Sequence, residues 1–192
     1  MLNSRLGQYG VTLVELMVVI VVLGIMIAFA VPSYRDWIQN QQTRAAAESI
    51  LNGMQFTRNT AVGNNTTARF ELCRLTSSNW EVMVAASAPA SAPVADAICG
   101  VGATNEFRVQ ERNGLEGSRN VVVTTVPGGA TTVTFNSLGR VTANADSSVP
   151  ITSVTINTPT GSRSLQVNVG GGGNVRMCDP ASSLAITDPR HC

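Results

Sequence analysis

The chain of 192 residues has a formal net charge of +1, because its 13 basic residues nearly balance its 12 acidic ones, and 44% of its residues are hydrophobic. A balance of this kind gives no general electrostatic attraction to nucleic acid or anionic lipid, so it argues against a function that depends on a broad basic surface. If a leader and a long N-terminal helix take up roughly 60 residues, about 130 remain for one compact domain.

An apolar segment from Val11 to Val31 follows a short leader at residues 1–10 and contains one charged residue, Glu15. Because an α-helix rises about 1.5 Å per residue, this segment would reach roughly 30 Å, which is enough to cross the hydrocarbon core of a bilayer. A carboxylate inside such a segment costs about 2.5–3.5 kcal/mol on insertion scales, so it should have a partner. Once the leader is removed, the nearest cation is the α-amino group of Val11. The amine of a neighbouring copy could reach Glu15 more easily than the amine of the same helix.

Two simpler interpretations of the apolar segment stay open at this stage. An ordinary signal peptide would have its cut site at Ala28-Phe29-Ala30, but the apolar run is long, contains Glu15 and continues directly into a helix-forming stretch. A plain membrane anchor explains the apolar residues but neither Gly10 nor Glu15.

The helix should continue beyond the apolar segment and change its character at Pro32. This proline lacks an amide hydrogen and, together with the low helix propensity of Gly24, should bend or locally open the helix. Beyond it, apolar residues recur at helical spacing as one stripe that should cover a sheet. The residues of this stripe are Ala47, Ile50, Leu51, Met54 and Ala61. The residues of the opposite face, which should be solvated or face other subunits, are Arg35, Asp36, Gln39, Arg44 and Arg58. The helix should end at residues 63–65, Gly-Asn-Asn.

The remaining sequence consists of short alternating runs separated by Gly, Pro, Asn and Ser, which predicts antiparallel strands and hairpins. The predicted strands are Ala68–Leu75, Trp80–Ala85, Glu106–Gln110, Val121–Val126, Thr131–Asn136, Val149–Asn157, Ser164–Val169 and Asn174–Cys178. A low-complexity segment of alanine, serine and proline at residues 86–93 should be an extended, mobile loop. A long helix packed on antiparallel strands is an α+β arrangement. We therefore predict a leader at 1–10, a transmembrane helix at 11–35, an amphipathic helix at 36–62 and a β-rich head at 63–192.

All the cysteines lie in the predicted head: Cys73, Cys99, Cys178 and Cys192. An even number of cysteines in an extracytoplasmic domain predicts two disulfides, and four cysteines allow three pairings. We favour the nearest-neighbour pairing, which joins the first cysteine to the second and the third to the fourth, because it closes the shortest loops. The alternative is a metal site that adds Asp179 and His191 to the last two cysteines, but its spacing matches no zinc pattern and an oxidising compartment favours the bridge.

No pattern of catalytic or cofactor-binding residues stands out in the sequence. His191 is the only histidine, and no acid or nucleophile is spaced to work with it. The run Gly170–Gly173 is not a phosphate-binding loop, because the chain has no lysine, and it is better interpreted as a flexible hairpin turn. We therefore expect no enzymatic activity, no cofactor and no metal site.

The segment Gly10–Glu15, the apolar helix and a proline at the 22nd residue counted from Val11 resemble the start of type IV pilins and of the pseudopilins of type II secretion. In that family a prepilin peptidase cuts after the glycine and methylates the new N-terminus, which here implies cleavage after Gly10 and N-methylation of Val11. Phenylalanine is more usual in the family at the position of this valine. The resemblance also implies that Glu15 helps to dock each subunit into a filament, and that the helix can melt between its glycine and its proline during packing.

Three short motifs are similar to the final strands of the GspH/FimT/FimU branch of minor pilins and pseudopilins, and they lie at residues 135–141, 163–167 and 173–178. Two disulfides favour the pilus side of this branch. The bridge to the last cysteine resembles the C-terminal disulfide loop of many pilins.

Some FimT-like pilins take up DNA through arginines near the C-terminal loop, which carries a Gly-Arg-x-Arg stretch. The nearest counterpart here, Gly173–Arg176, has one arginine fewer, so we do not favour DNA binding. The residues that could still contact phosphates, weakly and with a strong salt dependence, are Arg163, Arg176, Arg190 and His191. The alternative is that these arginines pair with Asp179 and Asp188 or make contacts between subunits.

The resemblance implies a minor pilin of a type IV pilus, made in the bacterial inner membrane as a single-pass prepilin with a periplasmic head. After cleavage it would enter a tip or priming complex that initiates assembly, and would end in the pilus fibre at the cell surface. Its partners would be the prepilin peptidase, the inner-membrane assembly platform, other minor pilins and the major pilin. The alternatives are a GspH-type minor pseudopilin of type II secretion and a FimT-like DNA receptor.

Overall fold

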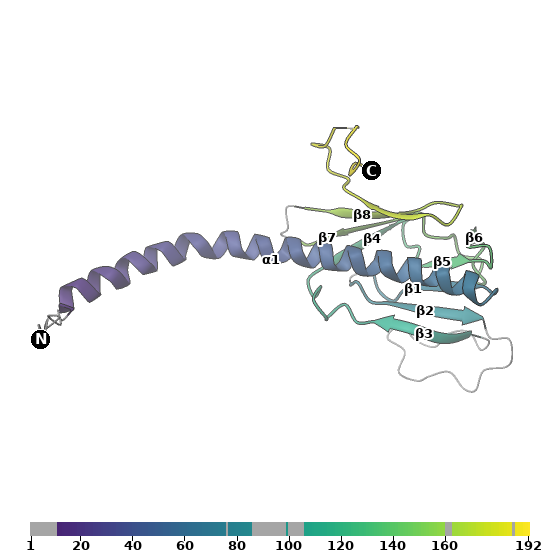
Figure 1. Ribbon diagram of the computed structural model, residues 1–192, viewed down its shortest axis with the longest axis horizontal. Helices are drawn as coiled ribbons and strands as arrows, with labels where there is room; N and C mark the ends of the chain where they lie inside the picture. Colours follow the sequence, from purple (N-terminus) through teal and green to yellow (C-terminus); the bar gives the residue numbers. More distant parts are fainter. Residues whose placement is uncertain (1–10, 76, 86–98, 100–105, 160–162, 186) are drawn as a thin grey trace, which may run out of the picture. The chain divides into compact units, whose positions relative to one another are not determined.

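The computed structural model describes residues 11–75, 77–85, 99, 106–159, 163–185 and 187–192 (Figure 1). The chain divides into two compact units, of which the first ends at Trp37 and the second covers Ile38–Cys192. One helix, α1 (Leu13–Gly63), contributes to both units. The predicted leader and the predicted loop at residues 86–93 lie outside the described residues.

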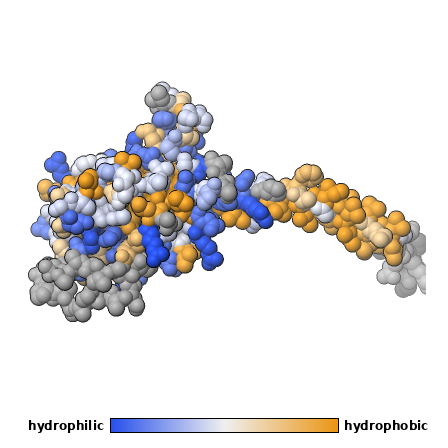
Figure 2. Space-filling model, turned by 180° about the vertical axis from the view of Figure 1, so that it is seen from behind, coloured by the Kyte–Doolittle hydropathy of each residue, from blue (hydrophilic) through white to orange (hydrophobic). Residues whose placement is uncertain are grey.

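The part of α1 in the first unit is an exposed apolar helix. All its large apolar side chains from Leu13 to Val31 are exposed, by 42% to 79% of their surface, and the face of this segment seen in Figure 2 is mostly orange. Among the described residues, α1 is the one helix long and apolar enough to span a membrane. Its helical backbone is unbroken through Gly24 and Pro32. The local opening expected between them is therefore absent from this structure and stays a prediction for the chain inside a filament.

The second unit contains two antiparallel β-sheets in addition to the rest of α1. The strands are β1 (Ala68–Leu72), β2 (Trp80–Ala85), β3 (Glu106–Arg112), β4 (Val122–Val126), β5 (Thr132–Phe135), β6 (Val141–Thr142), β7 (Ser153–Asn157), β8 (Leu165–Val169) and β9 (Val175–Cys178). The first sheet has the order β3-β2-β1-β5-β6 and the second the order β4-β7-β8-β9. Every neighbouring pair is antiparallel. The α+β arrangement predicted from the sequence, a long helix packed on antiparallel strands, is confirmed.

Each predicted strand coincides with a strand of the structure, and the differences lie at the ends. The run predicted from Val149 becomes a strand only at Ser153. Pro150 has no amide hydrogen to donate to a ladder, and Ile151 N donates to the carbonyl oxygen of Thr132 in the first sheet and not to the second sheet. The short strand β6 was not predicted, since its two residues are too few to show a periodic pattern. The predicted end of the helix is confirmed at Gly63.

One hydrophobic core includes residues of α1 and of both sheets. The predicted stripe of the helix is confirmed, because four of its residues are fully buried and Leu51 packs against the core partly buried. The helix comes close to the first sheet at Gly53, where an added Cβ would lie 2.8 Å from the ring of Phe70. Beside this contact, Trp80 Nε1 donates a hydrogen bond to Ser49 Oγ at 2.8 Å. These contacts fix the second half of α1 on the sheet.

Arg58 does not lie on a solvated face of the helix, as the sequence had suggested. It is half-buried, and its Nε donates a hydrogen bond of 3.1 Å to the carbonyl oxygen of Gly139, in the turn between β5 and β6. The helical period places Arg58 on the polar side of the stripe, but this turn folds over the last part of the helix and gives the guanidinium a carbonyl partner.

The turn between β8 and β9 meets the same carbonyl oxygen. Gly173 in this turn has a φ of +84°, and a Cβ on it would collide with the carbonyl oxygen of Gly139. A second link joins the two sheets nearby, where Val141 N in β6 donates a hydrogen bond of 3.2 Å to the carbonyl oxygen of Gly171. We call this meeting of two turns and the helix the turn junction. The predicted hairpin turn at Gly170–Gly173 is confirmed, but contacts hold one side of it in place.

Candidate functional site

The first turn of α1 contains the candidate assembly residue, Glu15. Thr12 precedes the helix, and its Oγ1 accepts a hydrogen bond from Glu15 N at 3.2 Å while its carbonyl oxygen accepts one from Leu16 N at 3.1 Å. Thr12 is therefore the N-cap of the helix. The spacing of a threonine three residues before a glutamate is a known signal for a helix start, so this cap could have been predicted from the sequence. The carboxylate in this first turn lies at the positive end of the helix dipole.

The exposed start of α1 leaves Glu15 accessible to another molecule. No cation among the described residues forms an ion pair with it. Val11, the predicted new N-terminus, is 70% exposed and precedes the first helical residue by two positions. Gly10 lies outside the described residues. A carboxylate and a potential α-amino group thus stand close together in sequence on an exposed apolar segment.

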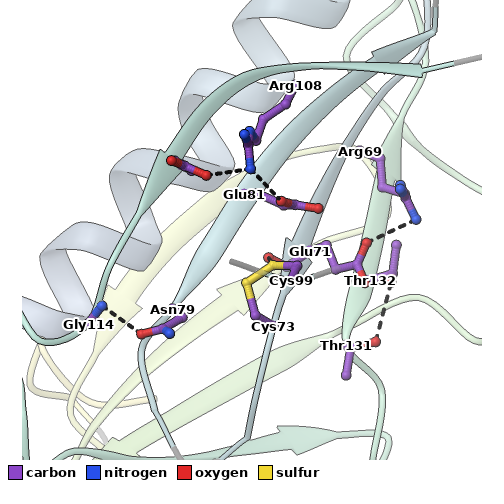
Figure 3. Close-up of a disulfide and its surroundings, with 11 residues drawn as sticks. Arg69, Glu71, Cys73, Asn79, Glu81, Cys99, Arg108, Gly114, Thr131 and Thr132 are labelled. Carbon is purple, nitrogen blue, oxygen red and sulfur yellow. Dashed lines mark hydrogen bonds and ion pairs between the residues drawn. A yellow bond between two sulfur atoms is a disulfide. The ribbon is translucent and has the colours of Figure 1, made fainter. Parts of the chain in front are cut away.

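The head contains two disulfides, Cys73–Cys99 and Cys178–Cys192. This is the nearest-neighbour pairing. The first bridge begins at the residue that follows β1 (Figure 3), and the second joins the last residue of β9 to the last residue of the chain. The alternative metal site near the C-terminus loses two of its four ligands to the second bridge. The part of the chain that the structure describes contains no group of three or more side chains that could hold a metal ion.

The C-terminal arginines bond to carboxylates. Arg163 Nε and Nη2 donate to Asp179 Oδ2 at 3.2 and 3.1 Å. Arg190 Nε and Nη2 donate to the two oxygens of Asp188 at 3.1 and 2.7 Å. The hydrogen bonds from Arg190 lower the pKa of Asp188 to about 2. The alternative in which arginines pair with Asp179 and Asp188 is therefore confirmed for Arg163 and Arg190.

The other two residues of the candidate DNA patch do not restore a basic surface. Arg176 is exposed on β9, opposite Asn168 of β8, and His191 is half-buried and pairs through its backbone with Asp179. An open hollow of about 280 Å³ beside the tail is lined by Arg163, Arg190 and Arg44, and each of these has a carboxylate partner. The balance of charge argues against strong binding of phosphates here.

A row of three glutamates crosses the first sheet. Glu71 on β1 pairs with Glu81 on β2, which in turn pairs with Glu111 on β3. Arg69 Nη1 lies 3.0 Å from Glu71 Oε2, and Arg108 Nη1 lies 2.5 Å from Glu111 Oε2 and 3.8 Å from Glu81 Oε2 (Figure 3). The side chain of Glu81 is only 2% exposed. Burial, and after it the negative charge of Glu71, raises the pKa of Glu81, while Arg108 opposes this increase only in part.

Replacing Glu81 with glutamine should make the stability of the head less dependent on pH. Because the pKa of Glu81 is higher in the folded chain than its ordinary value of 4.5, the folded state binds the proton more tightly. The free energy of unfolding therefore falls as the pH rises from 4.5 through the folded pKa. Thermal unfolding of the detergent-solubilised chain over a series of pH values would measure this slope.

The matched control for this prediction is Glu116→Gln, because Glu116 is an exposed carboxylate away from the row. The control should keep the pH dependence of the unchanged chain. At neutral pH, Glu81→Gln should be at least as stable as the unchanged chain, since Arg108 keeps its partner Glu111. A Glu81→Gln variant with an unaltered pH dependence would contradict the assignment of the buried charge.

Sequence comparisons match two parts of the chain. A family model described as type II transport protein GspH matches residues 46–173, and a prokaryotic N-terminal methylation motif matches residues 5–31. The chain is 44% identical to the type IV major fimbrial protein FimA of Dichelobacter nodosus over 48 residues, or 25% of this chain. It is 43% identical to the type IV major alpha-pilin of Moraxella bovis over 47 residues, or 24% of this chain. These matches cover 29% and 30% of the length of the two relatives.

Structural comparisons match most of the chain. The type IV minor pilin FimU of Pseudomonas aeruginosa (strain PAO1) aligns with a TM-score of 0.50 and 11% identity, over 73% of this chain and 91% of that chain. The minor pseudopilin EpsH of the type 2 secretion system of Vibrio cholerae aligns with a TM-score of 0.46 and 12% identity, over 73% of this chain and 98% of that chain. At these identities the FimU match concerns the fold alone.

Proposed function

Because the chain belongs to the GspH family of type II transport proteins, we propose that it is a minor pilin of a type IV pilus. It enters a tip or priming complex through its N-terminal helix, and this complex initiates assembly of the fibre. Before assembly the chain lies in the bacterial inner membrane as a single-pass protein with its head in the periplasm. Its partners are the prepilin peptidase, the assembly platform, other minor pilins and the major pilin.

The observation that carries the proposal is an apolar helix with one carboxylate in its first turn. Its large apolar side chains from Leu13 to Val31 are exposed, so the segment needs an apolar surrounding, in lipid first and then among other helices. About a quarter of the chain is similar to type IV fimbrial proteins, which supports assembly into a filament. The two disulfides support the pilus over the secretion system.

The mechanism is assembly and not chemical catalysis. Lipid tails are as apolar as the helix, so moving the helix from lipid into a filament gains little from the hydrophobic effect, and packing and polar pairs must favour the filament. The bundled helices then supply van der Waals contacts along the whole apolar segment. The carboxylate of Glu15 pairs with the α-amino group of a neighbouring subunit, and this pair sets the axial position of the incoming helix.

The N-terminus of the mature chain is a first expected result. Membrane-extracted protein should begin at Val11, with a methyl group on its amine, because the matched methylation motif at residues 5–31 contains both Gly10 and the apolar run that follows it. Mass spectrometry of the N-terminal peptide measures both the position and the methyl group. A chain that begins at Val31 would mean ordinary signal cleavage and would refute the proposal.

The second expected result separates the pilus from the alternative, a GspH-type minor pseudopilin of type II secretion. Deleting the gene should reduce the number of surface pili seen by electron microscopy, while secretion of exoproteins stays unchanged. A plasmid copy of the unchanged gene should restore the pili. Normal piliation together with lost secretion would assign the chain to the secretion system.

A further inference from the structure

Two aromatic side chains stack on the surface of α1 just after its apolar segment. The rings of Tyr34 and Trp37 lie 5.9 Å apart between centroids, at an interplanar angle of 25°. They are three residues apart and therefore share one face of the helix. Both are exposed, by 61% and 56%. Trp37 is also the last residue of the first unit, so the pair stands where the unit of the apolar helix ends.

The position of this pair follows from the rise of the helix. Tyr34 and Trp37 come three and six residues after Val31, or roughly 5 and 9 Å along the axis. The headgroup zone extends about 5–7 Å beyond the hydrocarbon core on each side, and an average tilt of about 20° shortens the projected distance. When the segment up to Val31 fills the hydrocarbon core, the ring of Tyr34 falls in the headgroup zone. The side chain of Trp37 leans back toward the N-terminus of the helix by about one residue, or ~1.5 Å, so its ring reaches the outer limit of this zone.

The neighbouring side chains fit this level and no deeper one. Arg35 and Asp36 lie between the two aromatic residues and are exposed, and a charge in the hydrocarbon core costs about 2.5–3.5 kcal/mol. The rings, with Val31 and Ser33, also line an open hollow of about 710 Å³ on the helix surface. Apolar rings beside the charged side chains of Arg35 and Asp36 match the headgroup region, which is partly apolar and partly hydrated. Tryptophan and tyrosine favour this zone because they combine an apolar body with a polar N–H or O–H.

We propose that Tyr34 and Trp37 form an interfacial anchor that binds phospholipid headgroups at the outer face of the inner membrane. This inference rests on the proposed function, because it requires the helix to span the membrane before assembly. The indole Nε1–H and the phenol O–H donate to headgroup oxygens, and the ring faces cover the ends of the acyl chains nearest the surface. The anchor fixes the depth of the helix in the membrane, and therefore the depth at which Glu15 meets the α-amino group of a neighbouring subunit.

Depth-dependent fluorescence quenching tests the anchor. The full chain is placed at low protein-to-lipid ratio in vesicles of phosphatidylethanolamine and phosphatidylglycerol, which contain lipids brominated either near the headgroup or near the end of the acyl chain. The signal of Trp37 is the difference between the unchanged chain and Trp37→Phe, because the remaining Trp80 is 97% buried in the head (3% exposed). A Val21→Trp substitution in the Trp37→Phe background places an indole about 24 Å deeper along the helix, near the middle of the hydrocarbon core, as a ruler.

The shallow bromines should quench Trp37 more strongly than the deep ones, and the order should be reversed for the ruler at position 21. If the ruler is quenched by deep bromines while Trp37 is quenched by neither set, the ring lies in water, and the anchor is refuted while the membrane step stands. Stronger quenching of Trp37 by deep bromines also refutes it. If neither indole is quenched, the helix is not in the bilayer and the proposed function fails as well. Low chain density keeps contact with a second copy from producing the same result.

Discussion

Replacing Glu15 with glutamine should leave the chain in the membrane but reduce its recovery in sheared pili by about 10- to 100-fold. A carboxylate in lipid costs about 2.5–3.5 kcal/mol at the centre of a helix, and less near its end. Pairing with the α-amino group of a neighbouring subunit removes this cost, and a factor of ten corresponds to about 1.4 kcal/mol. Glutamine keeps the shape of the side chain and lowers its free-energy cost in lipid. The variant therefore gains less free energy when the helix moves from the membrane into the filament. Immunoblots of sheared and membrane fractions measure the partition.

Two controls separate charge from packing in this experiment. Glu15→Asp keeps the negative charge on a shorter side chain and should recover part of the incorporation. Leu16→Ala removes apolar bulk from the next position without touching the charge, and should reduce incorporation far less than Glu15→Gln. Normal amounts of Glu15→Gln in the pili, with membrane levels equal to those of the unchanged chain, would exclude the ion pair as the docking contact.

Replacing Gly173 with alanine should produce the largest loss of stability among the glycines of the strand turns. Its φ of +84° is strained for any residue with a Cβ, which costs about 1–2 kcal/mol. The added Cβ also collides with the carbonyl oxygen of Gly139, a backbone atom that cannot move aside as a flexible side chain can. Overpacking adds about 1–3 kcal/mol, so the melting temperature of the head should fall by about 5–15 °C. Thermal unfolding of the detergent-solubilised chain, with its disulfides intact, measures the change.

Other glycines of the same chain separate strain from collision. An added Cβ at Gly171 or at Gly117 would meet no atom within 4 Å, and only Gly117 has a positive φ, of +86°. Gly171→Ala should therefore change the melting temperature very little, whereas Gly117→Ala should show the strain alone. The loss in Gly173→Ala should exceed both. Equal losses in Gly117→Ala and Gly173→Ala would mean that the backbone of the turn junction shifts to accommodate the added Cβ.

The features that the sequence predicted well are those that depend on neighbours along the chain. The apolar run, the stripe that includes Ile50 and Met54, and the alternating strands each carry a periodic pattern, and the structure has the corresponding elements. The cap at Thr12 also depends only on residues near it in the sequence, and its spacing to Glu15 predicts it. Strand ends were less accurate, because a break such as that at Pro150 depends on hydrogen-bond partners in another strand.

The features that the sequence did not predict depend on residues far apart in the chain. Arg58 has a partner only because a turn 81 residues later folds over the helix. The burial of Glu81 arises where three strands set their glutamates side by side, and no single strand contains that information. The candidate site is divided in the same way, since Glu15 is visible in a local motif while the neutralisation of Arg163 by Asp179 requires the folded tail.

The pairing of all four cysteines also makes the chain convenient for single-site labelling. Because no free cysteine is present, an introduced one would be the only thiol that reacts with a maleimide dye under non-reducing conditions. Gly172 is a suitable position, since it is exposed and a Cβ there meets no atom within 4 Å. A fluorophore at this position would allow individual subunits to be followed by light microscopy on living cells, without a fused reporter protein that is larger than the head itself.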